Sequence, residues 1–124
     1  MSQLLPIMIG GAFGAAARFL MAEKVYLLMG RDFPYGVLVV NVLGSFLMGL
    51  LAILLIQKFP ENQALRLAVI VGFLGAFTTF STFSLDTLNL FQSGEVLKAF
   101  FNILSNVVVC VLAVWLGMFA AKQF

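Results

Sequence analysis

The spacing of the charged residues is the feature that most constrains this chain. Four uncharged and largely apolar stretches, of 17, 21, 19 and 23 residues, occupy positions 1–17, 36–56, 67–85 and 99–121. Each is close to the roughly 20 residues that an α-helix needs to cross about 30 Å of hydrocarbon. We therefore predict an all-α polytopic membrane protein whose four transmembrane helices form a single domain over residues 1–124.

The segments between these stretches read as turns. They cover residues 23–35, 57–66 and 92–95, and they carry Pro34, Pro60 and Gly94. Connections this short make consecutive helices antiparallel neighbours.

Composition excludes several classes of function. Hydrophobic residues make up 63% of the chain and charged residues 10%, which is not the composition of a soluble domain. With no histidine and a single cysteine, Cys110, the chain has neither a His/Cys metal site nor a disulfide framework. There is no phosphate-binding glycine loop for ATP and no clustered basic patch for nucleic acid. No nucleophile–base pair or cofactor motif indicates an enzyme.

The basic residues near the span ends give no preferred orientation. Three lie on the side that holds both termini, and three lie on the opposite side: Lys58, Arg66 and Lys122 against Lys24, Arg31 and Lys98. The positive-inside rule is therefore balanced, with only a weak contribution from Arg18. Balanced charge predicts insertion in both orientations and an antiparallel homodimer. The alternative is that orientation is set by features other than these charges.

Small residues in the first two spans indicate close helix packing. Gly10, Gly11 and Gly14 lie in the first span, and Ser45 and Gly49 lie in the second. Lipid supplies no hydrophobic drive for helix association, so small residues that let backbones approach are the usual contact sites.

Polar side chains inside the spans carry the functional argument, because they are costly in hydrocarbon. The first span contains Arg18 and the second contains Asn41 followed one turn later by Ser45. In the fourth span Asn102, Ser105 and Asn106 fall on one helical face.

The third span contains the most unusual segment, GAFTTFSTFS at 75–84, in which five hydroxyl residues alternate with three phenylalanines. Counted from Arg66, residues 75–78 lie roughly 14–18 Å deep, near the bilayer midplane. Such a segment is where a transmembrane helix can unwind if the freed backbone is buried or faces a cavity. Asp86 follows it, either at the interface or at a pathway mouth.

These side chains suit a small, strongly hydrated anion. Asn amides and Ser/Thr hydroxyls donate hydrogen bonds, and phenylalanine ring edges are electropositive. No acidic residue lies in the middle of a span, so a cation pathway lacks its usual carboxylate. The simpler alternative is that Asn and Ser join the helices and that Phe only packs.

Three motifs, in order, resemble those of the Fluc/CrcB family of fluoride channels. They are GGAFGAAARF at 10–19, VNVLGSF at 40–46 and GFLGAFTTFSTFS at 72–84. Length and span number also match over the whole chain, although the fourth span has no motif of this kind.

The resemblance implies a passive fluoride channel that lowers cytoplasmic fluoride. It implies a dual-topology homodimer in a bacterial inner membrane, with two antiparallel pores. Asn41 would contact fluoride, Phe80 and Phe83 would present ring edges to it, and Ser81 and Thr82 would continue a polar track. Thr79 and Asn106 are further expected pathway residues, and Arg18 is expected to shape the anion vestibule.

The resemblance also implies a structural Na⁺ on the dimer axis. Backbone carbonyls of Gly75 and Thr78, in the broken third span, would coordinate it. A midplane position is the only one that two oppositely inserted copies could share.

Two rival functions stay open at this point. A small dual-topology multidrug transporter needs a membrane-embedded glutamate in its first span, but Glu23 lies at the end of that span. A non-conducting membrane subunit would show the glycine packing motifs without converging hydrogen-bond donors.

Overall fold

The computed structural model describes residues 2–124, which are helical apart from short connections and contain no β-strand. The first two spans are α1 (Leu4–Met29) and α2 (Tyr35–Lys58). The third runs through α3 (Gln63–Arg66), η1 (Leu67–Leu74), α4 (Gly75–Phe77) and α5 (Phe80–Gln92). The fourth runs through α6 (Val96–Leu104), η2 (Ser105–Val109) and α7 (Cys110–Ala121). By length and hydropathy, these 123 described residues contain four candidate membrane spans, as predicted.

The helices extend beyond the uncharged stretches, so the connections are shorter than expected. Residues 23–29, predicted as loop, continue α1 because they contain no helix breaker; the helix ends at Gly30, whose φ of 86° suits only glycine. Likewise α3 begins at Gln63, because the Asn62 side chain accepts a hydrogen bond from the Leu65 amide and caps the helix.

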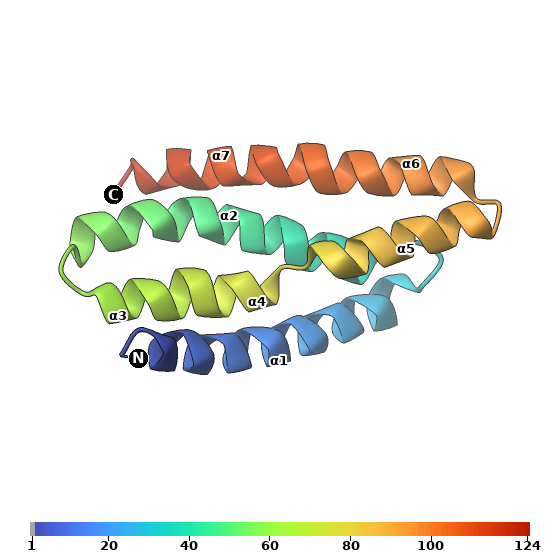
Figure 1. The fold of residues 1–124 in the computed structure, drawn as a ribbon. Coiled ribbons are helices and arrows are strands. Elements are labelled where there is room, and N and C mark those ends of the chain that lie inside the picture. The colour runs from blue at the N-terminus through green and yellow to red at the C-terminus, as the bar shows by residue number, and fades with distance from the viewer. Residues whose placement is uncertain (1) are drawn as a thin grey trace.

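The third span changes neighbours halfway along its length (Figure 1). Its first half, through η1 and α4, packs along α1, whereas α5 packs along α6. Meanwhile α2 packs along α7, and the two termini lie at the same end of the bundle as the α2–α3 turn. The segment between α4 and α5 is therefore where the chain crosses from one side of the bundle to the other.

Thr78 and Thr79 form this crossing, with extended backbone dihedrals (φ −88°, ψ 158° and φ −149°, ψ 124°). The sequence predicts unwinding at residues 75–78, but Gly75 keeps helical dihedrals (φ −61°, ψ −36°). The extended residues are the two threonines because Thr79 caps α5, its hydroxyl accepting a hydrogen bond from the Thr82 amide.

At two helix–helix contacts the backbones touch directly, because glycines face the neighbouring helix. A Cβ atom at Gly10 would lie 2.0 Å from the Ala68 carbonyl oxygen, and one at Gly14 would lie 2.2 Å from the Phe73 carbonyl oxygen. On the other side of the bundle, a Cβ at Gly49 would lie 2.1 Å from the Val114 carbonyl oxygen. These glycines pack as predicted, whereas Gly11 has more room, since a Cβ there would lie 3.8 Å from the Gly72 carbonyl oxygen.

Two stretches wind as π-helix, a conformation that is rare and often found at functional sites. One, η1, leads into α4 and the crossing, and the other, η2, carries Asn106. Both therefore adjoin the region where polar side chains meet.

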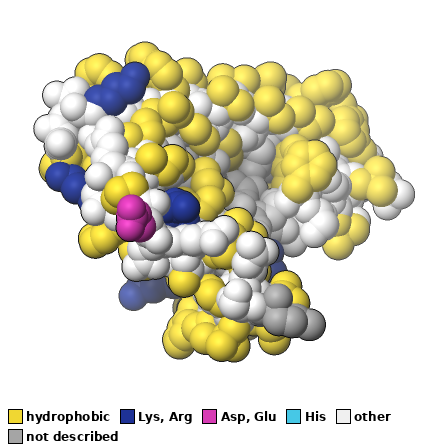
Figure 2. Space-filling view, turned by 60° about the vertical axis from the view of Figure 1, so that its left-hand side comes forward, with side chains coloured by type: hydrophobic (Ala, Val, Ile, Leu, Met, Phe, Trp, Pro, Cys, Tyr) yellow, Lys and Arg dark blue, Asp and Glu magenta, His cyan; other side chains and the backbone are white. Residues whose placement is uncertain are grey.

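Apart from Arg18 in the middle of α1, charged side chains lie toward the ends of the bundle, and apolar side chains cover its flanks. Figure 2 brings the end with the termini forward and shows scattered basic side chains there, between broad apolar surfaces. Exposed residues along the flanks include Leu20, Leu97 and Trp115, all more than half exposed. This surface suits lipid contact, so the fold is that of a multi-pass membrane protein.

Candidate functional site

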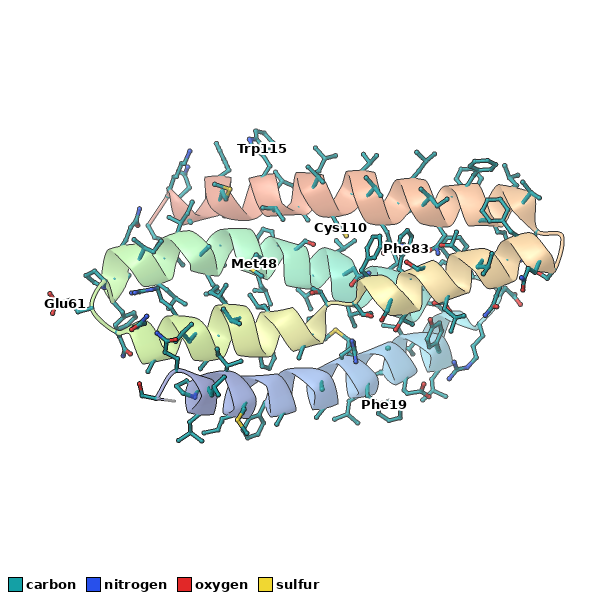
Figure 3. The ribbon with its side chains drawn as sticks, in the orientation of Figure 1. Phe19, Met48, Glu61, Phe83, Cys110 and Trp115 are labelled. Carbon is teal, nitrogen blue, oxygen red and sulfur yellow. The ribbon has the colours of Figure 1, made fainter. Side chains whose placement is uncertain are left out.

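A cavity of about 330 Å³ opens beside the crossing, between the second, third and fourth spans. Its lining includes polar and aromatic side chains from three spans: Asn41 and Ser45 of α2, Thr78 and Thr79 of the crossing, Phe80 and Phe83 of α5, and Asn106 and Cys110 of the fourth span. Figure 3 shows the side chains of Phe83 and Cys110 directed into the space between the third and fourth spans. The structure thus brings together five of the predicted pathway residues, namely Asn41, Thr79, Phe80, Phe83 and Asn106.

Asn41 holds the crossing in place through two hydrogen bonds to one residue. The Thr79 backbone N–H donates to Asn41 Oδ1 (2.8 Å), and Asn41 Nδ2 donates to the Thr79 carbonyl oxygen (3.1 Å). An extended residue cannot use its backbone groups in a helix, and an unpaired buried amide is costly. The buried Asn41 side chain therefore supplies the acceptor that the Thr79 N–H has lost, and it adds a hydrogen bond to the Thr79 carbonyl.

A chain of buried hydrogen bonds continues from Asn41 into the fourth span. Asn41 Nδ2 also donates to Asn106 Oδ1 (2.9 Å), and Asn106 Nδ2 donates to Asn102 Oδ1 (3.0 Å). Asn102 Nδ2 donates in turn to the Thr87 hydroxyl (2.9 Å). Within residues 2–124, every buried side-chain nitrogen and oxygen has a partner.

The two phenylalanines form a tilted pair at the cavity. Their ring centroids are 5.3 Å apart and the ring planes meet at 57°. Phe83 is only 7% exposed, whereas Phe80 is 76% exposed in the single chain. A tilted pair can present a ring edge to a ligand, and Phe80 lacks full protein cover in one copy of the chain.

Ser81 and Thr82 do not line this cavity; they lie on the exposed face of α5. Thr79 Oγ1 donates to Thr82 Oγ1 (3.1 Å), so the Thr82 hydroxyl proton is free to point elsewhere. The Ser81 hydroxyl is 3.5 Å from Thr79 Oγ1, at the limit of hydrogen-bond distance. Both residues therefore supply donors beside Phe80 rather than within the cavity.

At the crossing, the carbonyls of Gly75 and Thr78 lose the N–H groups that would donate to them in a continuous helix. The Thr79 N–H, the normal i+4 partner of the Gly75 carbonyl, donates to Asn41 Oδ1. The Thr82 N–H, the corresponding partner of the Thr78 carbonyl, donates to Thr79 Oγ1. Residues 2–124 contain no cluster of three or more His, Cys, Asp or Glu side chains for a metal. Carbonyl oxygens freed in this way are suitable ligands for a hard cation.

Charged residues lie away from the cavity. Arg18 is half-buried in α1 and is not among the residues that line it. Glu23 is engaged near the end of α1, where Arg31 donates a hydrogen bond to it (2.9 Å). Asp86 borders a separate polar pocket with Tyr26, Arg31 and Asp32.

Sequence reasoning missed two residues that shape the site. A Cβ at Gly44 would lie 2.3 Å from Thr78 Cγ2, so this glycine gives the crossing its space against α2. The Thr87 hydroxyl accepts from Asn102 and donates to the Phe83 carbonyl oxygen (2.8 Å). Its four-residue spacing from Phe83 could have indicated that both lie on one helical face.

Comparison with known proteins identifies the family. The family model described as CrcB-like protein, Camphor Resistance (CrcB), matches residues 5–118. A protein of Methylococcus capsulatus named fluoride-specific ion channel FluC is 54% identical over 120 residues, which are 97% of this chain and 53% of that relative.

Two further relatives carry the same name. The protein of Hydrogenovibrio crunogenus is 53% identical over 122 residues, covering 98% of this chain and 92% of the relative. That of Magnetococcus marinus is 52% identical over 120 residues, covering 97% and 98%. The chain thus spans about half the length of the first relative and nearly all of the other two. The family match over most of the chain and the four apolar helical spans together establish that this multi-pass membrane protein belongs to the CrcB-like family.

Proposed function

We propose that this protein is a fluoride-selective channel that lets fluoride leave the cytoplasm passively. The observation that carries the proposal is the cavity at the crossing, where amide and hydroxyl groups meet the Phe80–Phe83 pair and none of the lining residues is acidic. Curated relatives at 52–54% identity are named fluoride-specific ion channels, which supports the same assignment.

Asn41, Thr79 and Asn106 would line the fluoride pathway with the two rings. Both N–H groups of Asn41 already donate within the protein, to Thr79 and Asn106. A fluoride ion that takes a hydrogen bond from Asn41 must therefore replace one of these oxygens as the acceptor. Ser81 and Thr82, whose hydroxyl groups lie beside Phe80, would continue the path, and Arg18 would shape a vestibule.

An antiparallel homodimer with two pores is the assembly we propose. Phe80, Ser81 and Thr82 are exposed in the single chain although they lie inside a membrane span. Hydroxyl groups facing lipid are unfavourable, and a second copy of the chain would cover them. The equal numbers of basic residues at the two ends favour opposite orientations of the two copies.

A structural Na⁺ at the dimer axis fits the diverted carbonyls of Gly75 and Thr78. Each has lost its normal helical donor, and Gly75 lies on an exposed surface that a second copy could share. The ion would tie the two copies together at the crossing. We expect dimers purified without Na⁺, with N-methyl-D-glucamine as the replacement cation, to dissociate more readily in detergent than dimers kept in Na⁺.

The rival transport mechanism has less support in the structure. A multidrug antiporter of this size requires an embedded carboxylate, but Glu23 is paired with Arg31 at a bundle end. We place the channel in the bacterial inner membrane, where the membrane potential would expel fluoride released from hydrogen fluoride inside the cell.

Anion efflux from liposomes tests the proposed function. Purified protein would be reconstituted in vesicles loaded with fluoride or with chloride, and release would be followed with ion-selective electrodes after a K⁺ ionophore is added. We expect rapid release of fluoride and little release of chloride. Equal release of both anions, or none of either, would overturn the proposal and favour a nonselective pore or a non-conducting subunit.

A further inference from the structure

We infer that Thr87 and Asn102 are positioning residues, which fix the direction of the Asn41 and Asn106 amides from outside the cavity. The inference rests on the proposed function, because it concerns the same pathway. Neither residue lines the cavity, and both are buried, with Asn102 1% exposed and Thr87 8% exposed. Any effect they have on the pathway must therefore pass through other residues.

The hydrogen-bond chain has a single direction because backbone groups anchor both of its ends. At one end the Thr79 N–H can only donate, so the Asn41 oxygen must face it and the Asn41 NH₂ must face Asn106. At the other end the Phe83 carbonyl can only accept, so the Thr87 proton must point to it. The lone pairs of the Thr87 oxygen are then left to accept from Asn102 Nδ2.

The two anchors together determine the orientation of each amide between them. Asn102 turns its NH₂ to Thr87 and its oxygen to Asn106, which donates to both Asn102 Oδ1 and the Asn102 carbonyl oxygen (3.0 Å each). Asn106 therefore presents its oxygen to Asn41. A reversed amide anywhere in the chain would place donor against donor or acceptor against acceptor.

This chain also ties both cavity walls together. The Thr87 hydroxyl donates to the carbonyl of Phe83, whose ring belongs to the aromatic pair. Asn41 accepts from the Thr79 N–H at the crossing. Polar networks that are fully satisfied make a buried region rigid, whereas partly satisfied ones leave alternative arrangements. Breaking the Thr87 end would leave the buried Asn102 Nδ2 without a partner and free the Asn102 amide to turn. Asn106 would then be held by the Asn102 backbone carbonyl alone, so the acceptor that it offers to Asn41 would be less firmly placed.

The test compares Thr87→Val with Thr87→Ser. Valine keeps the shape of threonine but removes the hydroxyl, whereas serine keeps the hydroxyl and loses only a methyl group. We expect Thr87→Val to lower fluoride efflux from liposomes at least about tenfold, because it leaves a buried amide unpaired. Thr87→Ser should stay within about twofold of wild type. Ser93→Ala, which removes an exposed hydroxyl bonded to the Leu90 carbonyl, is the matched control and should not alter efflux.

A double-mutant cycle separates positioning from general destabilisation. In Asn106→Ala the chain is already cut, so adding Thr87→Val should lower efflux by less than about twofold more. If the two losses multiply, or if Thr87→Val conducts like wild type, the inference is wrong.

A measurement without fluoride keeps this result distinct from failure of the proposed function. Side-chain NH₂ protons of Asn41, observed by NMR in micelles, should exchange with water slowly in the wild type and faster in Thr87→Val. Equal exchange rates would overturn the inference even if the wild-type protein conducts fluoride. If the wild-type protein instead releases no fluoride, the proposed function fails while the exchange result still reports on the chain.

Discussion

Asn41 and Thr79, 38 residues apart in the sequence, exchange two hydrogen bonds across the interface of the second and third spans. The pairing imitates the one between neighbouring strands, with a side-chain amide in place of a second backbone. It lets the third span leave its helix inside the membrane without an unpaired peptide group at Thr79. The cavity and the helix break therefore depend on the same side chain.

Asn41→Asp tests this dual role. Aspartate keeps the oxygen that accepts from the Thr79 amide but loses both donors, and it places negative charge where an anion must pass. We expect fluoride efflux to fall at least about tenfold while the protein still purifies as the wild type does. The control is Asn62→Asp, the same chemical change at an exposed helix cap that only accepts a hydrogen bond. Wild-type efflux in Asn41→Asp would remove Asn41 from the pathway.

Phe80→Leu and Phe83→Leu distinguish ion-facing rings from packing. A leucine at a packing position usually costs less than about 1.5 kcal/mol, but it lacks the electropositive ring edge. We expect each variant to remain folded, by its melting temperature in detergent, and to lose most fluoride efflux. Methionine, with a polarizable thioether, should restore part of the efflux at one of the two positions.

The matched control for the ring variants is Phe19→Leu. Phe19 is 64% exposed and points away from the bundle (Figure 3), so its replacement should leave efflux unchanged. Near-normal efflux in both Phe80→Leu and Phe83→Leu would assign these rings to ordinary packing.

Gly44→Ala tests how tightly the crossing is held against α2. The added methyl group would lie 2.3 Å from Thr78 Cγ2 and 3.1 Å from the Phe77 ring, so the crossing must shift. We expect reduced efflux and a lower melting temperature, since overpacking typically costs about 1–3 kcal/mol. Gly11→Ala is the control, because its methyl group meets only an atom at 3.8 Å. Similar behaviour of the two variants would show that the crossing tolerates displacement.

Topology in cells tests the proposed antiparallel dimer. Reporters fused to the C-terminus should show both orientations, because the two ends carry equal basic charge. Adding two lysines in the Gln63 region should bias the population to one orientation and, when expressed alone, lower fluoride resistance. A uniform orientation of the unmodified protein would contradict the dual-topology proposal.

The sequence by itself determined the membrane class, the number of spans and five of the residues that line the cavity. Uncharged apolar stretches of about 20 residues are long enough to cross a bilayer, which fixes the number of spans. Polar side chains inside a span are costly in hydrocarbon, so their presence there indicates a functional site. The resemblance of three motifs added the family, which the family match confirms.

Only the tertiary structure decided where the third span breaks and how the polar groups are paired. Helix propensity favours a break at Gly75 over one at Thr79. The break nevertheless lies at the threonines, because Asn41 reaches the Thr79 amide from another span. In the same way, periodicity placed Asn102 and Asn106 on one face but could not give their partners. Those partners follow from the crossing, where the third span passes from α1 to α6. This change of neighbour brings Thr87 of α5 next to Asn102. The direction of these hydrogen bonds depends on the Thr79 N–H and the Phe83 carbonyl, which meet the Asn side chains only in the folded protein.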